Sequence, residues 1–393
     1  MAGRGRGDGA PRPARGGDAG QRARVRMSSV EATAPVGSAP RGTVRQRLRA
    51  RLVAAVARLL VILPEPPINA LAVAIGEIWY RLAPDRAARA RRNFRRVAEH
   101  LVVRGLGGPR IRAAATDDRA LERVVRGAFG HAVRYYVDMA RLPGRSAADF
   151  ERRLIVETPD AVVDAFGSLH PPRPAGPAGP PGSHGPMIFV AMHFGAVEAP
   201  ALFAVARTGS RVTAPMETLD DPALQAFIAR TRASVGVDLV TLRDARRALT
   251  AALDQDRVVG MVADRNVAGG TVDVPFFGVT APLPMGPGLL AIERGLPIWV
   301  AAVRRASGGR YRGQLRRVDT PTEGTRRARL QAAMTGVARA MEESIAEAPE
   351  QWWSAFAPIW PDLDPEAREG SGHLEPAATA ATAGHPADGS AAR

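Results

Sequence analysis

The feature that most constrains the fold is a regular alternation of short apolar runs with helical patterns in the second half of the chain. Apolar runs of this length are typical of buried strands. Strands that alternate with helices are joined by right-handed crossovers into a mainly parallel sheet. We therefore expect an α/β fold, with a mainly parallel sheet flanked by helices. Strands are predicted at 187–192, 211–214, 239–242, 258–263 and 298–303, and helices at 194–206, 221–234, 245–253 and 289–294.

Helical patterns of another kind come first in the chain. The pattern predicts helices over 44–63, 68–82, 84–103 and 118–142, with prolines ending the first, and then a short strand at 150–156. Basic and apolar faces side by side suit a helix that lies on an anionic bilayer. The alternative is an ordinary bundle whose arginines are solvated. We expect residues 44–103 to be membrane-docking helices.

Composition sets the expected boundaries. Residues 1–43 form a basic tail rich in Gly, Ala, Arg and Pro, and residues 366–393 form a second low-complexity tail, so both are predicted to be disordered. A single domain is expected over 44–365. A Pro/Gly-rich run at 167–186 is predicted to be a surface loop inside it, either a neutral insertion or a segment that flanks the entrance for the substrate.

The charge is strongly positive. The net charge is +15, and all 54 basic residues are arginine. A coding bias towards arginine is one explanation, and attraction to an anionic surface is the other. The absence of cysteine excludes disulfides and thiolate metal sites. No run reaches the roughly 18–20 apolar residues that a membrane span needs, and no secretory signal is apparent, so peripheral attachment is expected.

One histidine stands where chemistry is expected. His193 follows the predicted strand 187–192, and ligands of parallel sheets bind beyond the carboxyl ends of the strands. Glu198 follows five residues later, in the first turns of the predicted helix. A carboxylate bonded to one ring nitrogen would raise the basicity of the other, which could then deprotonate a substrate hydroxyl. The alternative is a histidine with purely structural hydrogen bonds.

Several blocks around this histidine occur in a specific order. They are AMHFGAVE (191–198), APMETLDDPALQAFIARTRASVG (214–236), GMVADRNVAGGTVDVPFFG (260–278), LPMGPGLLAIERGLPI (283–298) and PEQWWSAFAPIW (349–360). The first is similar to the His-x-x-x-x-acid motif of lysophospholipid and glycolipid acyltransferases. The chain resembles the branch that contains the lipid A late acyltransferases and the phosphatidylinositol mannoside acyltransferases. The resemblance runs from about residue 45 to 361.

This resemblance implies an acyltransferase. The acyl donor would be a thioester of coenzyme A or acyl carrier protein, and the acceptor a hydroxyl of a glycolipid or phospholipid. His193 would be the general base and Glu198 the motif acid, where the mannoside branch often has Asp. No metal or cofactor is implied beyond the acyl donor as co-substrate. The implied partners are the acceptor lipid, the donor and an anionic membrane surface, with the protein peripheral to the cytoplasmic face of the plasma membrane.

Further candidates come from the matched blocks. Asp264 and Arg265 end the strand 258–263 and are candidates for substrate binding. An arginine there suits a phosphate or a developing oxyanion, or else a surface ion pair. Asp273 falls where similar mannoside acyltransferases carry an acid near the histidine; it would share the orienting role or be idle. Glu217 and Arg232 also match family positions and are candidates for substrate binding.

Two pairs of aromatic residues each allow two interpretations. Phe276 and Phe277 are candidates for the wall of an acyl tunnel, with core packing as the alternative. Trp352 and Trp353 suit a lipid interface or the core.

Three other functions compete. An ester hydrolase would need a nucleophile, but there is no cysteine and no G-x-S-x-G elbow. A nucleic-acid binder is suggested by charge alone, without a supporting motif, so no nucleic acid is expected. A membrane-docking protein without catalysis is the third alternative, and the His193–Glu198 pair argues against it.

Overall fold

The computed structural model describes residues 42–169, 184–267 and 269–364. The predicted tails at 1–43 and 366–393, apart from Gly42 and Thr43, lie outside these residues. Most of the predicted loop at 167–186 lies outside them too. The described residues include the whole sheet and the candidate site.

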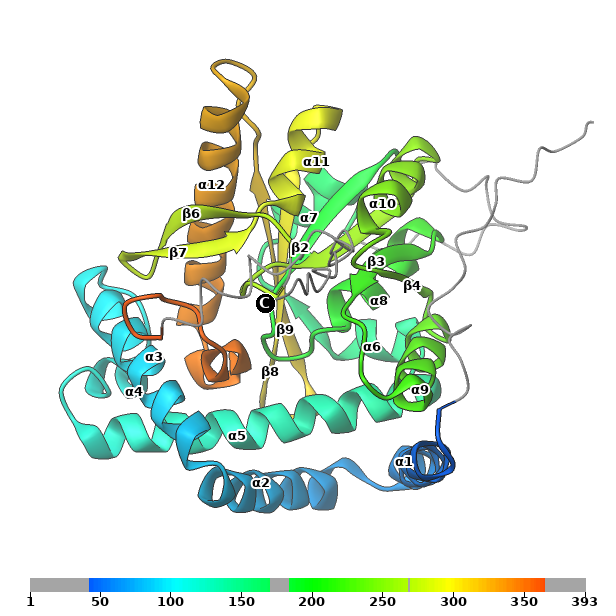
Figure 1. Ribbon diagram of the computed structural model, residues 1–393, viewed down its shortest axis with the longest axis vertical. Helices are drawn as coiled ribbons and strands as arrows, with labels where there is room; N and C mark the ends of the chain where they lie inside the picture. Colours follow the sequence, from blue (N-terminus) through cyan, green and yellow to red (C-terminus); the bar gives the residue numbers. More distant parts are fainter. Residues whose placement is uncertain (1–41, 170–183, 268, 365–393) are drawn as a thin grey trace, which may run out of the picture. The chain divides into compact units, whose positions relative to one another are not determined.

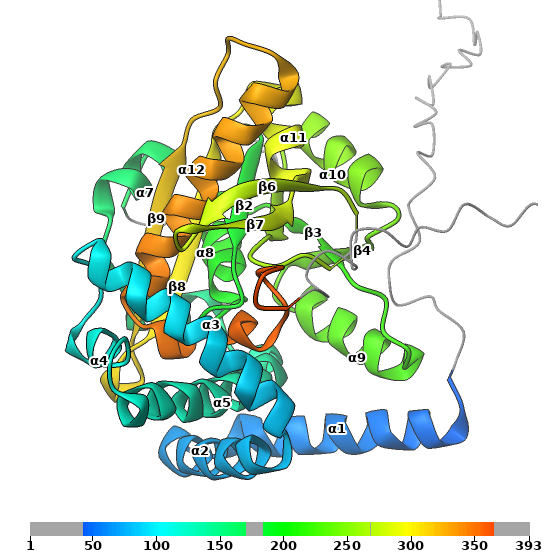
Figure 2. The ribbon, with the colours of Figure 1, turned by 60° about the vertical axis from the view of Figure 1, so that its left-hand side comes forward.

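The fold is built on a seven-stranded sheet with the order β1-β9-β8-β2-β5-β3-β4 (Figures 1 and 2). All neighbouring strands are parallel except β8 and β9. The expected α/β class with a mainly parallel sheet is therefore confirmed. The strands are β1 Leu154–Val156, β2 Met187–Ala191, β3 Val212–Met216, β4 Val237–Thr241, β5 Val258–Val262, β8 Ile298–Arg305 and β9 Tyr311–Val318.

Strand β2 lies at the centre of this sheet, between β8 and β5. Its register with β5 pairs Met187 with Val258 and Ala191 with Val262, so the two strands end side by side. Successive residues of β2 are buried in different clusters, because side chains of a strand alternate between faces. Ile188 packs into the core on one face and Phe189 into the core on the other. The residues that follow β2 and β5 therefore meet at one edge of the sheet.

Helices cover both faces. Helices α10, α11 and α12 pack on one face, α6, α7, α8 and α9 lie on the other, and α5 contributes side chains to both cores. The helices that follow β1 are α7 Pro159–Phe166, α8 Ala199–Thr208, α9 Pro222–Ala233, α10 Ala245–Asp254, α11 Gly286–Arg294 and α12 Arg326–Ala346.

The helices that precede the sheet largely confirm the sequence pattern. They are α1 Val44–Ile62, α2 Glu65–Leu82, α3 Pro84–Val103, α4 Pro109–Ala113, α5 Asp118–Arg141 and α6 Ala147–Arg153. Helix α2 begins three residues earlier than predicted, because prolines are tolerated in a first helical turn. Helices α1 and α2 both pack against α5. In the described parts of the chain, we find no helix with the length and apolar character to cross a bilayer.

Three local predictions were wrong. Residues 150–153 belong to α6, and only Leu154–Val156 form a strand. Helix α8 begins at Ala199 rather than at Phe194, because the chain makes a turn at Gly195 first. No strand was predicted between β5 and α11, but this region contains the antiparallel hairpin β6 Thr271–Phe276 and β7 Val279–Pro284. Strand β9 and helix α12 were also missed.

The turn of this hairpin explains why it was missed. Its two central residues, Phe277 and Gly278, both have positive φ, at 49° and 79°. That combination fits a type I′ turn, whose usual sequence is Asn-Gly or Asp-Gly. A phenylalanine at the first position gives no hairpin signal. In the fold, its backbone N–H is held by a hydrogen bond to the Glu342 carboxylate of α12.

Candidate functional site

His193 lies two residues beyond the end of β2, and its main chain is fixed at both ends. Its backbone N–H donates to Oδ2 of Asp264 at 2.9 Å. Its carbonyl oxygen accepts a hydrogen bond from the backbone N–H of Trp353 at 3.0 Å. The imidazole therefore projects from an anchored segment rather than from a free loop.

Asp264 is the carboxylate that faces this histidine. It follows β5 by two residues, so the neighbouring ends of β2 and β5 bring it to His193. The side chain is fully buried, and it accepts from the His193 backbone and from Trp352 Nε1 at 2.8 Å. Its Oδ1 lies 2.8 Å from His193 Nδ1. Burial alone would raise the pKa of Asp264, but His193 and the hydrogen bonds from His193 and Trp352 lower that pKa to about 2.

This contact decides the form of the imidazole. An ionised carboxylate can only accept hydrogen bonds, so His193 Nδ1 must carry a proton and donate it to Asp264. The Ser354 hydroxyl oxygen, 3.1 Å from Nδ1, is a second neighbour of that nitrogen. In the neutral ring Nε2 then carries the lone pair, and it has no hydrogen bond among the described residues. The His193 side chain remains 16% exposed.

The neighbouring aromatic residue also limits how the ring can move. The Trp353 ring meets the His193 ring edge to face, with the centroids 4.5 Å apart. Trp353 in turn lies 4.8 Å from the Tyr135 ring of α5. The imidazole is thus held between a buried acid and a rigid aromatic wall.

Gly195 makes the turn after His193 possible. Its φ is +54°, and a Cβ at this position would lie 2.1 Å from the carbonyl oxygen of Val303 in β8. Its N–H donates to the Gln351 carbonyl, and the next N–H, that of Ala196, donates to the Val303 carbonyl. No other residue fits such a close approach at this φ. The segment from His193 to Ala196 is therefore clamped between β8 and the chain before Trp352.

Glu198 occupies a different place from the one predicted. Because residues 194–198 form a turn and not a helix, Glu198 lies at the N-cap position of α8, without a side-chain capping hydrogen bond, and is paired with Arg232 of α9. Its Oε1 accepts from Arg232 Nη2 at 3.0 Å, and the same Nη2 lies 3.1 Å from the Tyr135 hydroxyl. Burial lowers the pKa of Arg232, but Tyr135 and Glu198 outweigh this and raise it. The carboxylate bonded to His193 is Asp264, which sequence reasoning had assigned to substrate binding.

Two more predicted residues come together at the same edge of the sheet. Arg265, next to Asp264, donates to Glu217 Oε1 at 2.8 Å. Glu217 follows β3 directly, and both side chains are partly exposed. The structure therefore contains the surface ion pair that sequence reasoning held as the alternative for Arg265, and this pair borders the carboxyl ends of β3 and β5.

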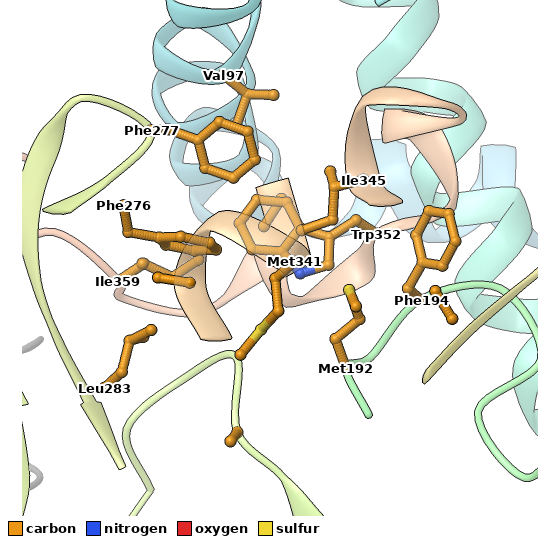
Figure 3. Close-up of a cluster of buried hydrophobic side chains, with 14 of the residues drawn as sticks. Val97, Met192, Phe194, Phe276, Phe277, Leu283, Met341, Ile345, Trp352 and Ile359 are labelled. Atoms are coloured by element: carbon orange, nitrogen blue, oxygen red, sulfur yellow. The ribbon is translucent and has the colours of Figure 1, made fainter. Parts of the chain in front are cut away.

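The remaining predicted residues lie on the β6–β7 hairpin. Asp273 is exposed on β6, so it does not have the desolvated position that an orienting role would require. Phe276 and Phe277 are fully buried and pack against Trp352 (Figure 3). Both also pack against Trp360. These phenylalanines belong to the core beneath the site, and the predicted tunnel wall is not found there.

Sequence reasoning missed the part that the chain after α12 plays. Trp352 and Ser354 both reach the His193–Asp264 pair, and Gln351 holds Gly195. The block PEQWWSAF carried this information only as a match, without a role for each residue. Trp352 is fully buried, which favours the core reading over the lipid interface.

An apolar cleft adjoins the site on the α8–α9 face of the sheet. Its walls come from β2, β3, β4, β5 and α8, and Glu198 and Arg232 are its charged lining residues. The cleft has a volume of about 90 Å³ and is otherwise lined by side chains such as Phe189, Val212 and Leu239. It suits the apolar part of a ligand whose polar part lies towards the strand ends. The described residues contain no group of three acidic or histidine side chains placed to hold a metal ion.

Part of the chain is similar to known proteins. Residues 182–355 match the family described as bacterial lipid A biosynthesis acyltransferases. The phosphatidylinositol mannoside acyltransferases of two Mycobacterium tuberculosis strains, CDC 1551 / Oshkosh and ATCC 25618 / H37Rv, are each 27% identical over 166 residues. That alignment covers 41% of this chain and 48% of each relative, so the chain spans about half the length of the curated relatives it matches. The resemblance to the lipid A acyltransferase family is thus confirmed over the region that carries His193 and Asp264.

Proposed function

We propose that this relative of the lipid A acyltransferases moves a fatty acyl group from a thioester to a hydroxyl of a lipid-linked acceptor. The observation that carries the proposal is the hydrogen bond between His193 Nδ1 and the ionised Asp264. It leaves Nε2 as a base at the carboxyl edge of the sheet. The family match supplies the reaction class, and the adjoining apolar cleft offers room for part of an acyl chain.

The reaction then follows general-base catalysis. Nε2 of His193 takes the proton of the acceptor hydroxyl while the oxygen attacks the thioester carbonyl. The imidazolium is stabilised by Asp264. When the tetrahedral intermediate collapses, the carbon–sulfur bond breaks, and the proton on Nε2 passes to the departing thiolate. An ester and a free thiol are produced, and no covalent acyl-enzyme is needed.

The other predicted residues take supporting roles in this proposal. Glu198 holds Arg232 in place beside the apolar cleft, through the ion pair at 3.0 Å. Arg265 is available to exchange Glu217 for a phosphate of the donor or the acceptor, since guanidinium groups bind phosphate oxygens well. The donor is acyl coenzyme A or acyl carrier protein. Asp273 has no part in this mechanism.

Peripheral attachment to the cytoplasmic face of the plasma membrane completes the proposal. Exposed apolar side chains follow one another along α1 and α2, with arginines beside them. These apolar residues are Val44, Leu48, Leu52, Val56, Leu59 and Ile62 on α1, and Leu71, Val73, Ile75, Ile78 and Leu82 on α2. Such helices can lie in the interface of an anionic bilayer and bring the site to its lipid substrate.

The test is a transfer assay with the purified full-length chain. Palmitoyl coenzyme A and palmitoyl acyl carrier protein serve as donors, and a lipid A precursor and phosphatidylinositol mannoside as acceptors. With any pair that reacts, His193→Gln should lower the rate roughly 10²–10⁴-fold while the circular dichroism spectrum is unchanged. His184→Gln, an exposed histidine outside the site, is the matched control. A folded His193→Gln protein with normal turnover would refute the mechanism.

A further inference from the structure

A second cavity lies away from the apolar cleft, where the beginning of α2 meets the last turns of α5 and the turn between β8 and β9. Five arginines line it: Arg134, Arg141, Arg145, Arg305 and Arg310. The lining contains two carboxylates, Glu65 and Asp138. We call this cavity the arginine pocket.

Both carboxylates of the arginine pocket are already engaged. Glu65 accepts hydrogen bonds from Arg145 and from Arg153, a further arginine. Asp138 accepts from Arg305 Nε at 2.8 Å. Positive charge therefore exceeds negative charge in the lining even after these pairs are formed.

Two arginines carry buried N–H groups without a hydrogen-bond acceptor among the described residues. The Arg305 side chain is only 3% exposed, and its Nη1 has no partner, although Nη2 lies 2.7 Å from Asp138. Arg134 Nε is also buried and unsatisfied. A buried charged donor without an acceptor is costly, so these groups favour an added anion.

Burial, together with the excess of positive charge, lowers the pKa of two residues of α5 near this pocket. Burial, followed by the Arg305 charge, lowers the pKa of Arg134. Burial and the charges of Arg305 and Arg134 lower the pKa of His131, one turn away on α5, to about 3. The histidine is therefore neutral at pH 7 and adds no further positive charge beside the arginines.

We propose that the arginine pocket binds a phosphate group. Arginines from α5, from β8 and from the turns that follow them line one small space, and a tetrahedral oxyanion can accept from several of them at once. On the same measure as the apolar cleft, the cavity holds about 10 Å³, so a phosphate would bind at its open mouth. A phosphate there would accept from the exposed Arg310, and it would reach the buried Arg305 Nη1 and Arg134 Nε once the arginine side chains shift to admit it. The rest of the molecule that carries the phosphate stays outside.

The place of the pocket favours a lipid headgroup as the source of the phosphate. Ile68 and Asn69 of α2 line the pocket, and the same helix carries the exposed Leu71 and Ile75 one turn further on. A helix that lies on a bilayer would place its neighbouring basic pocket at the level of the lipid phosphates. Free phosphate is the other source of the same chemistry. The inference does not depend on acyl transfer.

The experiment is calorimetric titration of the full-length chain with sodium phosphate, at an ionic strength held constant with sodium chloride. Saturable binding is expected for the wild type. Arg134→Gln and Arg310→Gln should each weaken phosphate binding about tenfold or more. Arg310 is exposed at the mouth of the pocket, so its replacement should disturb the fold less than that of Arg134. Arg327→Gln, an exposed arginine of α12, is the matched control and should leave binding unchanged.

A second titration, with dihexanoyl phosphatidic acid below its critical micelle concentration, separates the two sources. Tighter binding than inorganic phosphate assigns the pocket to a lipid headgroup; equal or weaker binding assigns it to free phosphate. The proposal is overturned if the wild type shows no saturable binding. It is also overturned if Arg310→Gln and Arg134→Gln bind as the wild type does, or if Arg327→Gln weakens binding equally. Each of these outcomes is independent of whether His193→Gln loses acyl transfer.

Discussion

Asp264 contacts His193 at two points. Its Oδ2 accepts a hydrogen bond from the His193 backbone N–H at 2.9 Å, and its Oδ1 lies 2.8 Å from Nδ1 of the ring. One carboxylate thus fixes both the main chain and the tautomer of the same residue. Trp352 Nε1 supplies a third hydrogen bond and seals the acid from water. Preorganisation of this kind keeps Nε2 in one orientation before any substrate arrives.

We predict that Asp264→Asn lowers the rate of acyl transfer roughly 10²–10⁴-fold. The amide can present an N–H to Nδ1, which would move the ring proton to Nε2 and remove the base; it also loses the charge that stabilises the imidazolium. The measurement is kcat and kcat/KM across pH 5–9. If Asp264→Asn retains at least half of the wild-type kcat, Asp264 is not the orienting acid.

Glu198→Gln should lower the stability of the protein more than its rate of acyl transfer, in contrast to Asp264→Asn. It leaves His193 and Asp264 intact but removes the charge that faces Arg232, and breaking a nearly buried ion pair costs about 3 kcal/mol. The free energy of unfolding in urea should therefore fall clearly, while kcat falls less than in Asp264→Asn. Replacing both partners, as in Glu198→Gln with Arg232→Met, should recover part of that stability. A Glu198→Gln protein of normal stability with a rate as low as that of Asp264→Asn would instead return the orienting role to Glu198.

The sequence predicted β2 and β5 but not that they lie side by side. Strand order depends on which crossover goes where, and no local pattern of residues records it. For that reason the sequence does not indicate that Asp264, 71 residues after His193, is the partner of this histidine, and the nearer Glu198 is the acid that it predicts. The turn at Gly195 could not be predicted for the same reason, because its close approach to the Val303 carbonyl involves a strand far along the chain.

Predictions of helices from apolar periodicity succeeded where the apolar residues of the helix pack into the core. Helix α3 has the predicted bounds of Pro84–Val103, because its apolar positions recur on one face. The hairpin Thr271–Pro284 failed because a Phe-Gly turn gives no local signal. An arginine-rich composition also hides pairing: the sequence marks Arg232 only as a family match and does not show that it is bonded to Glu198.

A pH experiment follows from the arginine-lined end of α5. His131 has a folded-state pKa of about 3 against an ordinary 6.5, so between these values only the unfolded chain takes up the proton. Stability is therefore complete above pH 6.5 and is lost as the pH falls towards 3. From pH 7 to pH 5 this group should cost about 2 kcal/mol in the free energy of unfolding.

The check is urea unfolding of wild type and His131→Leu at both pH values. The variant should lose about 2 kcal/mol less than the wild type on acidification, because it lacks the titrating group. His184→Gln, at an exposed position, should follow the wild type. An equal pH dependence in wild type and His131→Leu would show that His131 is not held neutral by the fold.

The last prediction concerns the exposed apolar residues of α1. Leu52 and Leu59, 64% and 52% exposed, lie on the side of α1 that the folded chain does not cover. Transfer of a leucine side chain out of water contributes about 1.5–3 kcal/mol, so Leu52→Gln with Leu59→Gln should weaken binding to phosphatidylglycerol-containing vesicles at least about tenfold in a flotation assay. Val163→Gln, at a similarly exposed valine of α7, is the control and should float as the wild type does. High salt should release only part of the wild-type protein, since salt screens the arginines but not apolar insertion. If the wild type stays at the bottom of the gradient at low salt, or if the double variant floats as well as the control, the apolar side of α1 is not a membrane-docking surface.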